Sequence, residues 1–177
     1  LIDELHSALD PKAYRKAVAL LAESEFIDIF GVENSLTPAM DLFTKLGYLG
    51  LTCRLNTDAY LQQIGAGHLP HGAVAVAFSH SGSSADTVKA LRLAKSHGAK
   101  TIAITNAIGA PLASWADVTL LTGRDSHTIY GNAIFSRVAD TALVDMLYMG
   151  VILSGYGRFS TALDESGRMI HDRVFEN

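Results

Sequence analysis

Short apolar runs alternate along the chain with longer segments in which apolar residues recur every three or four positions. The apolar runs lie at residues 26–31, 49–55, 73–79, 100–105 and 117–122. Their apolar residues follow one another and are not confined to every second position, which is typical of parallel strands covered on both faces. Strands that alternate with helical segments in this way predict an α/β fold, a doubly wound three-layer domain with a five-stranded parallel sheet.

The segments between these runs carry the signals of helices. In the first, expected at 10–24, Pro11 follows Asp10 at the first helical position and the apolar residues keep helical spacing. Further helices are expected at 36–47, 58–66, 84–97 and 131–154, with a helical turn near 111–115. We expect one domain over residues 1–154, followed by a polar tail, 155–177, that is compatible with a last helix.

Composition narrows the class of protein. Of the 177 residues, 49% are apolar and 18% are charged, which excludes a disordered chain and suits one domain with a proper core. No apolar run approaches the roughly 20 residues that span a bilayer, so we expect no membrane partner. The net charge of −4 lacks the basic footprint of a nucleic-acid-binding surface.

The cysteine content and the first residue bear on cellular context. Cys53 is the only cysteine, which rules out a disulfide framework and favours the reducing cytoplasm. The first residues do not have the pattern of a signal peptide. The chain opens at Leu1 and not at Met, and we therefore expect a domain cut from a longer protein, with a segment missing upstream.

A serine-rich turn follows the third apolar run. The sequence SHSGSS at residues 79–84 joins the expected strand 73–79 to the expected helix 84–97. At such a position the unpaired N–H groups and the dipole of the helix favour an anion, and serine hydroxyls can donate to it. Gly82 would let the backbone approach closely. The turn predicts a phosphate site made of neutral donors, since it contains no Lys or Arg.

Helix capping is the simpler alternative for these serines. Ser83 or Ser84 could be an N-cap, but capping alone accounts poorly for Ser79, Ser81 and Ser84 together. A second loop, FGVENS at residues 30–35, also joins a strand to a helix and contains side chains suited to sugar hydroxyls, although Ser35 could be an ordinary cap.

These two motifs carry a resemblance to a known family. G-V-E-N-S followed by S-H-S-G-S-S-x-D-T resembles the sugar isomerase (SIS) domain, a doubly wound module that binds phosphosugars. The stretches at 73–106, 111–121 and 135–153 look like the SIS domain of the MurR/RpiR family of bacterial transcriptional regulators. The resemblance covers about residues 10–154 and implies a flavodoxin-like strand order. It also implies a helix-turn-helix domain upstream, which would read DNA while this domain senses a metabolite.

The resemblance assigns roles to individual residues. It implies that the ligand phosphate is bound by Ser79, Ser81, Gly82, Ser84 and Ser35, with Thr87 in the same motif. We expect the sugar to be contacted by Glu33, Asn34, His80 and Arg137. One departure stands out, because the first loop of the family usually reads G-x-G-x-S and Glu33 replaces its second glycine. That carboxylate should either bind a sugar hydroxyl or exclude some ligands.

SIS domains also occur as phosphosugar isomerases, which need a base such as Glu or His to move a proton between adjacent carbons. In the hexuloisomerase-like enzymes a Glu stands near the start of the last long helix, where this chain has Ser136 and Arg137. The Ser-Arg pair resembles the regulators, so we expect a sensor without catalytic residues. An isomerase using Glu33, His80 or His127 is the alternative, and a dimerisation module that has lost its ligand is a third reading.

The remaining features concern metals and assembly. His68 and His71 have loose metal-like spacing but lack a third ligand, so we expect neither a metal nor a cofactor. Asn132 could contact a sugar hydroxyl or cap the last helix, and Arg137 could instead pair with Asp140 or with a neighbouring subunit. The expected helix 131–154 is too apolar to face water, and we therefore expect a homodimer or homotetramer, unless the tail covers it.

Overall fold

A computed structural model describes residues 2–123 and 136–171. Five parallel strands form one sheet in the order β2-β1-β3-β4-β5. The strands are β1 (Ile27–Phe30), β2 (Cys53–Leu55), β3 (Val74–Phe78), β4 (Lys100–Thr105) and β5 (Val118–Leu121). The predicted doubly wound α/β fold is confirmed, including the flavodoxin-like strand order.

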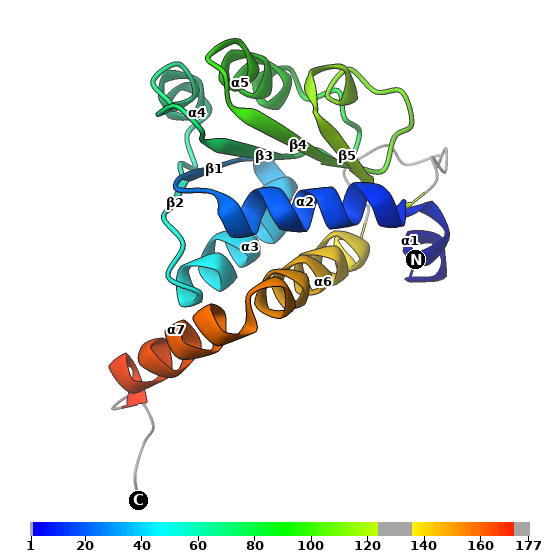
Figure 1. The fold of residues 1–177 in the computed structure, drawn as a ribbon. Helices are drawn as coiled ribbons and strands as arrows, with labels where there is room; N and C mark the ends of the chain where they lie inside the picture. The colour runs from blue at the N-terminus through cyan, green and yellow to red at the C-terminus, as the bar shows by residue number, and fades with distance from the viewer. Residues whose placement is uncertain (1, 124–135, 172–177) are drawn as a thin grey trace, which may run out of the picture.

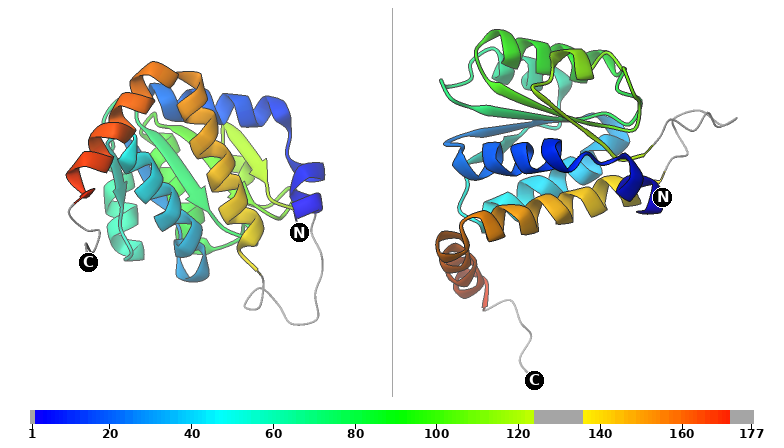
Figure 2. Two further views of the ribbon diagram at one scale, coloured as in Figure 1. Left: turned by 90° about the horizontal axis from the view of Figure 1, so that it is seen from below. Right: turned by 45° about the vertical axis from the view of Figure 1, so that its right-hand side comes forward.

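Helices cover both faces of this sheet and make three layers (Figure 1). On one face lie α2 (Pro11–Glu23), α3 (Leu36–Tyr48) and α6 (Val138–Ser154), and on the other lie α4 (Ala59–Ala66) and α5 (Ala85–Ser96). Helix α1 (Ile2–Ala8) packs on α6, and α7 (Tyr156–Met169) turns away from the end of α6 (Figure 2). Two short 3₁₀ helices complete the described elements, η1 (Glu33–Ser35) and η2 (Ala113–Trp115).

The two faces of the sheet differ in side-chain size. In β3 the larger residues Val74, Val76 and Phe78 belong to the core beneath α2, α3 and α6. Ala75 and Ala77 belong to the separate core beneath α4 and α5. Because neighbouring residues of a strand point to opposite faces, one strand supplies a bulky face and an alanine face. The alanine face lets α5 approach the sheet closely.

Local signals explain where two of the helices begin. The side chain of Asp10 accepts hydrogen bonds from the N–H groups of Lys12 (3.1 Å) and Ala13 (3.2 Å) at the start of α2. Asp58 accepts a bond of 2.9 Å from the N–H of Leu61 at the start of α4. Both are N-caps of the usual kind, which satisfy N–H groups that have no partner within the helix.

A buried ion pair ties β1 to β2. Asp28 is 1% exposed, and the strand register places it beside Arg54. The guanidinium donates two hydrogen bonds to the carboxylate, from Nε (3.0 Å) and from an Nη atom (2.6 Å), and it lies over the ring of Phe26. Burial raises the pKa of Asp28, and Arg54 offsets part of that rise. The bidentate pair accounts for a carboxylate inside an apolar strand.

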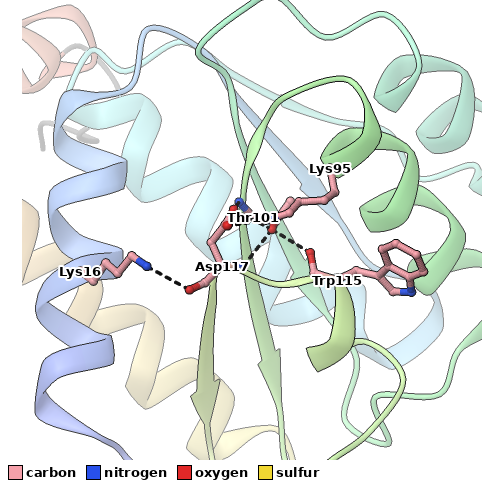
Figure 3. Close-up of polar contacts among 5 residues, drawn as sticks. All are labelled: Lys16, Lys95, Thr101, Trp115 and Asp117. Carbon is pink, nitrogen blue, oxygen red and sulfur yellow. Dashed lines mark hydrogen bonds and ion pairs between the residues drawn. The ribbon is translucent and has the colours of Figure 1, made fainter.

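A second polar cluster lies at the amino-terminal ends of β4 and β5 (Figure 3). Asp117 forms an ion pair with Lys95 of α5 and accepts a bond of 2.9 Å from the N–H of Thr101. Its main-chain carbonyl accepts a bond of 3.1 Å from Lys16 of α2. The hydroxyl of Thr101 donates to the carbonyl of Trp115 (2.8 Å). Side chains from both helical layers therefore meet at Asp117, the residue just before β5.

The structure corrects two expected boundaries and adds one helix. The strand expected at 49–55 is confined to Cys53–Leu55, because Leu49 and Leu51 lie in the turn that closes α3 and are buried from there. The helix expected from residue 131 begins at Val138, whose N–H donates to the hydroxyl of Ser136 (3.2 Å), while 131–135 lie outside the described residues. Helix α1 was not predicted, since only Leu5 of its residues is buried.

The last two described helices differ in their burial. Helix α6 buries residues along most of its length, whereas Phe159 is the one buried residue of α7. In the described chain no single helix is long and apolar enough to cross a membrane. Helices α6 and α7 meet that test only as a pair bent by 116°, by length and composition alone.

Candidate functional site

A pocket of about 470 Å³ opens where β1 and β3 end. These neighbouring strands lead to helices on opposite faces of the sheet, and such a switch point is where doubly wound folds bind ligands. Three segments form the walls, namely residues 32–35, residues 78–86 and the start of α6. The described lining residues are Val32, Glu33, Asn34, Ser35, Phe78, Ser79, His80, Ser81, Ser84, Asp86 and Arg137.

The serine-rich turn is held by β4 and by the loop after it. The carbonyl of His80 accepts hydrogen bonds from the N–H of Asn106 (3.0 Å) and the hydroxyl of Thr105 (3.1 Å). Gly82 has a φ of +61°, and a Cβ placed there would lie 2.4 Å from the Cβ of Ala110. Glycine is therefore required in this turn by both its conformation and its packing.

The helices that start at the pocket lack the caps found elsewhere. Ser84 and Ser35 occupy the N-cap positions of α5 and α3, and in the described chain neither makes a capping hydrogen bond. The hydroxyl of Ser84 instead accepts from the hydroxyl of Thr87 (3.3 Å). Capping, the simpler alternative for these two serines, is thus not what their side chains do. The first N–H groups of α5 are thus left open to an anion at the pocket, whereas α3 continues from η1, where the N–H groups of Ser35 and Leu36 already donate to main-chain carbonyls.

The loop at residues 31–35 is held by Gln62 of α4 and has a strained backbone at Glu33. Gln62, 1% exposed, donates to the carbonyl of Gly31 (2.7 Å) and accepts from its N–H (3.2 Å). Glu33 has a φ of +52°, and it is the one non-glycine residue with a positive φ in the described chain. That conformation costs a residue with a Cβ about 1–3 kcal/mol. Glu33 and Asn34 are exposed at the pocket's mouth.

The start of α6 contributes the cation of the pocket. The Arg137 side chain is 14% exposed, and its Nε lies 4.0 Å from a carboxylate oxygen of Asp140. Asp140 is buried, and burial raises its pKa, whereas a hydrogen bond from Thr122 and the charges of His80 and Arg137 lower it. Asp140 thus lies beneath the pocket, where the end of β5, the serine-rich turn and α6 come together.

The structure brings nearly all of the candidate residues to one place. Eight of them line the pocket, and Gly82 lies in the turn behind it. His127 and Asn132 lie outside the described residues. His68 and His71 are exposed beyond α4, and within the described ranges no group of three or more His, Cys, Asp or Glu side chains is arranged to hold a metal ion.

The sequence reasoning did not assign the roles of four supporting residues. Gln62 and Thr105 fix the two loops through bonds to main-chain atoms, and no local motif signals such roles. Asp86 lines the pocket from the first turn of α5, within the S-x-D-T part of the motif. From the sequence, Asp140 was considered only as a partner for Arg137. In the structure it is buried near Thr122 and His80 and supports the pocket from the protein interior.

Comparison with protein families gives one match over most of the chain. The SIS domain model matches residues 20–150. An uncharacterised HTH-type transcriptional regulator of Caldanaerobacter subterraneus is 30% identical over 176 residues, which are 99% of this chain and 62% of that protein. The HTH-type transcriptional regulator RpiR of Escherichia coli K12 is 24% identical over 169 residues, 96% of this chain and 54% of RpiR. The chain thus spans little more than half the length of these relatives.

Solved structures share the fold. The Vibrio vulnificus NanR protein, solved in complex with ManNAc-6P, superimposes with a TM-score of 0.91 at 24% identity, covering 99% of this chain and 66% of NanR. A proposed phosphosugar isomerase of Bacteroides fragilis superimposes with a TM-score of 0.73 at 24% identity, covering 90% of each chain. The same fold therefore occurs in regulators and in proteins assigned as isomerases.

Proposed function

Because the chain belongs to the SIS domain family and matches RpiR-family regulators over nearly its whole length, we propose that it is the effector-sensing domain of a transcriptional regulator. We propose further that its effector is a phosphorylated sugar. Its ligand would lie at the carboxyl ends of β1 and β3. DNA would be read by another segment of the regulator. The ManNAc-6P complex of NanR supports a ligand of this class.

The observation that carries the proposal is the uncapped start of α5 at the serine-rich turn. Asp10 and Asp58 cap α2 and α4, but Ser84 makes no capping hydrogen bond, so the first N–H groups of α5 are left for a ligand in the pocket. The pocket's serines add hydroxyl donors, and helix dipoles favour an anion there. A phosphate bound by these groups would be stabilised by uncharged donors, without Lys or Arg in the turn. The sugar would then face Glu33, Asn34, His80 and Arg137.

Helix α6 supports a link between the pocket and an output. Its first turn holds Arg137 and Asp140 at the site. Farther along the helix, Met146, Met149 and Leu153 are between 39% and 68% exposed, which leaves an apolar face suited to a second copy of the chain. We propose a homodimer or homotetramer whose arrangement changes with ligand. Such coupling requires that the ligand favour one arrangement over the other.

A phosphosugar isomerase is the second candidate. Structural neighbours assigned as isomerases support it, and Glu33 and His80 line the pocket as side chains able to move a proton. At the start of α6, however, Ser136 and Arg137 offer no base at neutral pH. This pattern favours a sensor over an enzyme.

The proposal is tested by thermal unfolding in the presence of a panel of sugar phosphates and of the corresponding free sugars. A ligand that binds only the folded state raises the melting temperature. We expect at least one phosphosugar, and not its free sugar, to stabilise the protein, and Ser81→Ala to weaken that effect. Ser96→Ala, at the far end of α5, is the matched control.

Two results would count against the proposal. If no phosphosugar shifts the melting temperature, or if Ser81→Ala responds as strongly as the wild type and the Ser96→Ala control, the serine-rich turn does not bind phosphate. The stabilising phosphosugar is also incubated with the protein, and the mixture is monitored by NMR. If the phosphosugar is converted into its aldose or ketose isomer, the protein is an isomerase and not a sensor.

A further inference from the structure

Glu33 combines an unfavourable backbone conformation with a place at the mouth of the pocket. A glycine would adopt its φ of +52° freely, whereas a residue with a Cβ does so only when the surroundings hold it there. Here the surroundings do so, because Gln62 binds both polar main-chain atoms of Gly31 and the N–H of Ser35 donates to the carbonyl of Val32 (3.0 Å). The fold thus maintains a carboxylate where a glycine would be less strained.

The other charged side chains of the pocket indicate which ligands the Glu33 carboxylate would accept. Among the described lining residues, Glu33 and Asp86 are acidic, Arg137 is basic and His80 can take up a proton. Arg137 already faces the buried carboxylate of Asp140, and Asp86 accepts a hydrogen bond from Gln63 (3.2 Å). Glu33, by contrast, is exposed at the mouth. One anion, held by the serine-rich turn and the N-terminus of α5, is accommodated, but a second anion would meet acidic side chains.

We infer that Glu33 restricts the pocket to phosphosugars whose remaining part is uncharged or carries an ammonium group, and that it excludes phosphorylated sugar acids. The inference rests on the proposed function, since it concerns the same site. Hydroxyl and ammonium groups donate hydrogen bonds to a carboxylate, which accepts but cannot donate when ionised. A ligand carboxylate at the same place would repel it.

The test uses two ligands that differ at one carbon. Sorbitol 6-phosphate and 6-phosphogluconate have the same six-carbon chain and phosphate, but C1 is a hydroxymethyl group in the first and a carboxylate in the second. Their dissociation constants, and that of inorganic phosphate, are measured by calorimetry for the wild type, E33Q and E33G. The control is E165Q, which makes the same change of charge at an exposed position on α7.

We expect the wild type and E165Q to bind sorbitol 6-phosphate about tenfold more tightly than 6-phosphogluconate, as one like-charge contact near a protein surface predicts. In E33Q and E33G the ratio should fall close to one, mainly through tighter binding of 6-phosphogluconate. E33G should also raise the melting temperature of the ligand-free protein, because glycine relieves the backbone strain, whereas E33Q should not.

The outcomes separate this inference from the function on which it rests. A ratio near one in the wild type, or a ratio unchanged in both variants, overturns the role of Glu33 and leaves the phosphate site standing. If inorganic phosphate binds but neither phosphosugar does, the inference is likewise overturned. If neither phosphate nor a phosphosugar binds to any of the proteins, the proposed function is overturned with it.

Discussion

Gly82→Ala is the substitution whose effect the structure determines most directly. The turn at Gly82 has a φ of +61°, and an added Cβ would lie 2.4 Å from the Cβ of Ala110 and 2.9 Å from the hydroxyl oxygen of Thr105. Thr105 in turn donates to the carbonyl of His80, so the turn cannot shift without loss of that bond. We expect the substitution to reduce stability and to deform the pocket's serine wall together.

The magnitude follows from two contributions. The left-handed conformation costs alanine about 1–2 kcal/mol, and overpacking against Ala110 adds about 1–3 kcal/mol. The free energy of unfolding should fall by about 2–5 kcal/mol, which lowers the melting temperature of a chain of this size by roughly 4–20 °C. Gly98→Ala separates the two contributions, because Gly98 has a φ of +87° and an added Cβ would meet nothing within 4 Å.

Urea and thermal unfolding of both variants, followed by circular dichroism, give the comparison. Gly98→Ala should lose only the backbone contribution, about 1–2 kcal/mol, and keep the response to the stabilising phosphosugar. Gly82→Ala should lose more and fail to respond. Equal losses in the two variants, or a normal ligand response in Gly82→Ala, would refute the claim that packing around the turn makes glycine necessary.

Three further predictions use other parts of the structure. Ser84→Ala should change the free energy of unfolding by less than about 0.5 kcal/mol while Asp58→Ala costs about 1 kcal/mol, because only Asp58 caps its helix; equal costs in urea unfolding would contradict this. Burial raises the pKa of Cys53 to about 12, so its thiol should react with a disulfide reagent at pH 8 only after unfolding, and stoichiometric reaction of the native protein would count against it. Burial raises the pKa of Asp117, but hydrogen bonds from Lys95 and Thr101 lower it by more, so its pKa in the folded protein lies below 3.8. The ionised Asp117 therefore stabilises the fold above pH 3.8, and this stabilisation is lost as the pH falls through the pKa of the folded state. Asp117→Asn should lose that part of the acid dependence, and an unchanged pH profile of unfolding would refute the assignment.

Much of the fold could be predicted because burial on both faces leaves a simple mark on the sequence. Residues 73–78 are apolar throughout, and the five residues of β3 within them are all buried. The same mark misled at 49–55, since Leu49 and Leu51 are equally apolar but reach the core from a turn. An apolar run reports burial and not the backbone conformation that achieves it.

The site was predictable to the extent that its parts are local. Each loop between a strand and a helix carries its own motif, so the serines and Glu33 could be named from the sequence, and Arg137 came from the family resemblance. The partner of Asp28 could not be named, because Arg54 reaches it through the register of β1 and β2. The clamp of Gln62 on Gly31 likewise joins residues 31 positions apart. Ligand binding by these residues stays a prediction.

The unequal faces of the sheet have a consequence for how the domain would respond to an occupant. Helix α3 packs with the bulky core and α5 with the alanine core, and the sheet separates the two. The pocket lies at the one edge where both helices begin. A bound molecule would therefore bridge two otherwise separate cores, and its binding energy would appear as slower amide hydrogen exchange in both layers at once. Occupancy of the pocket would then determine whether the two helical layers unfold locally one at a time or only together.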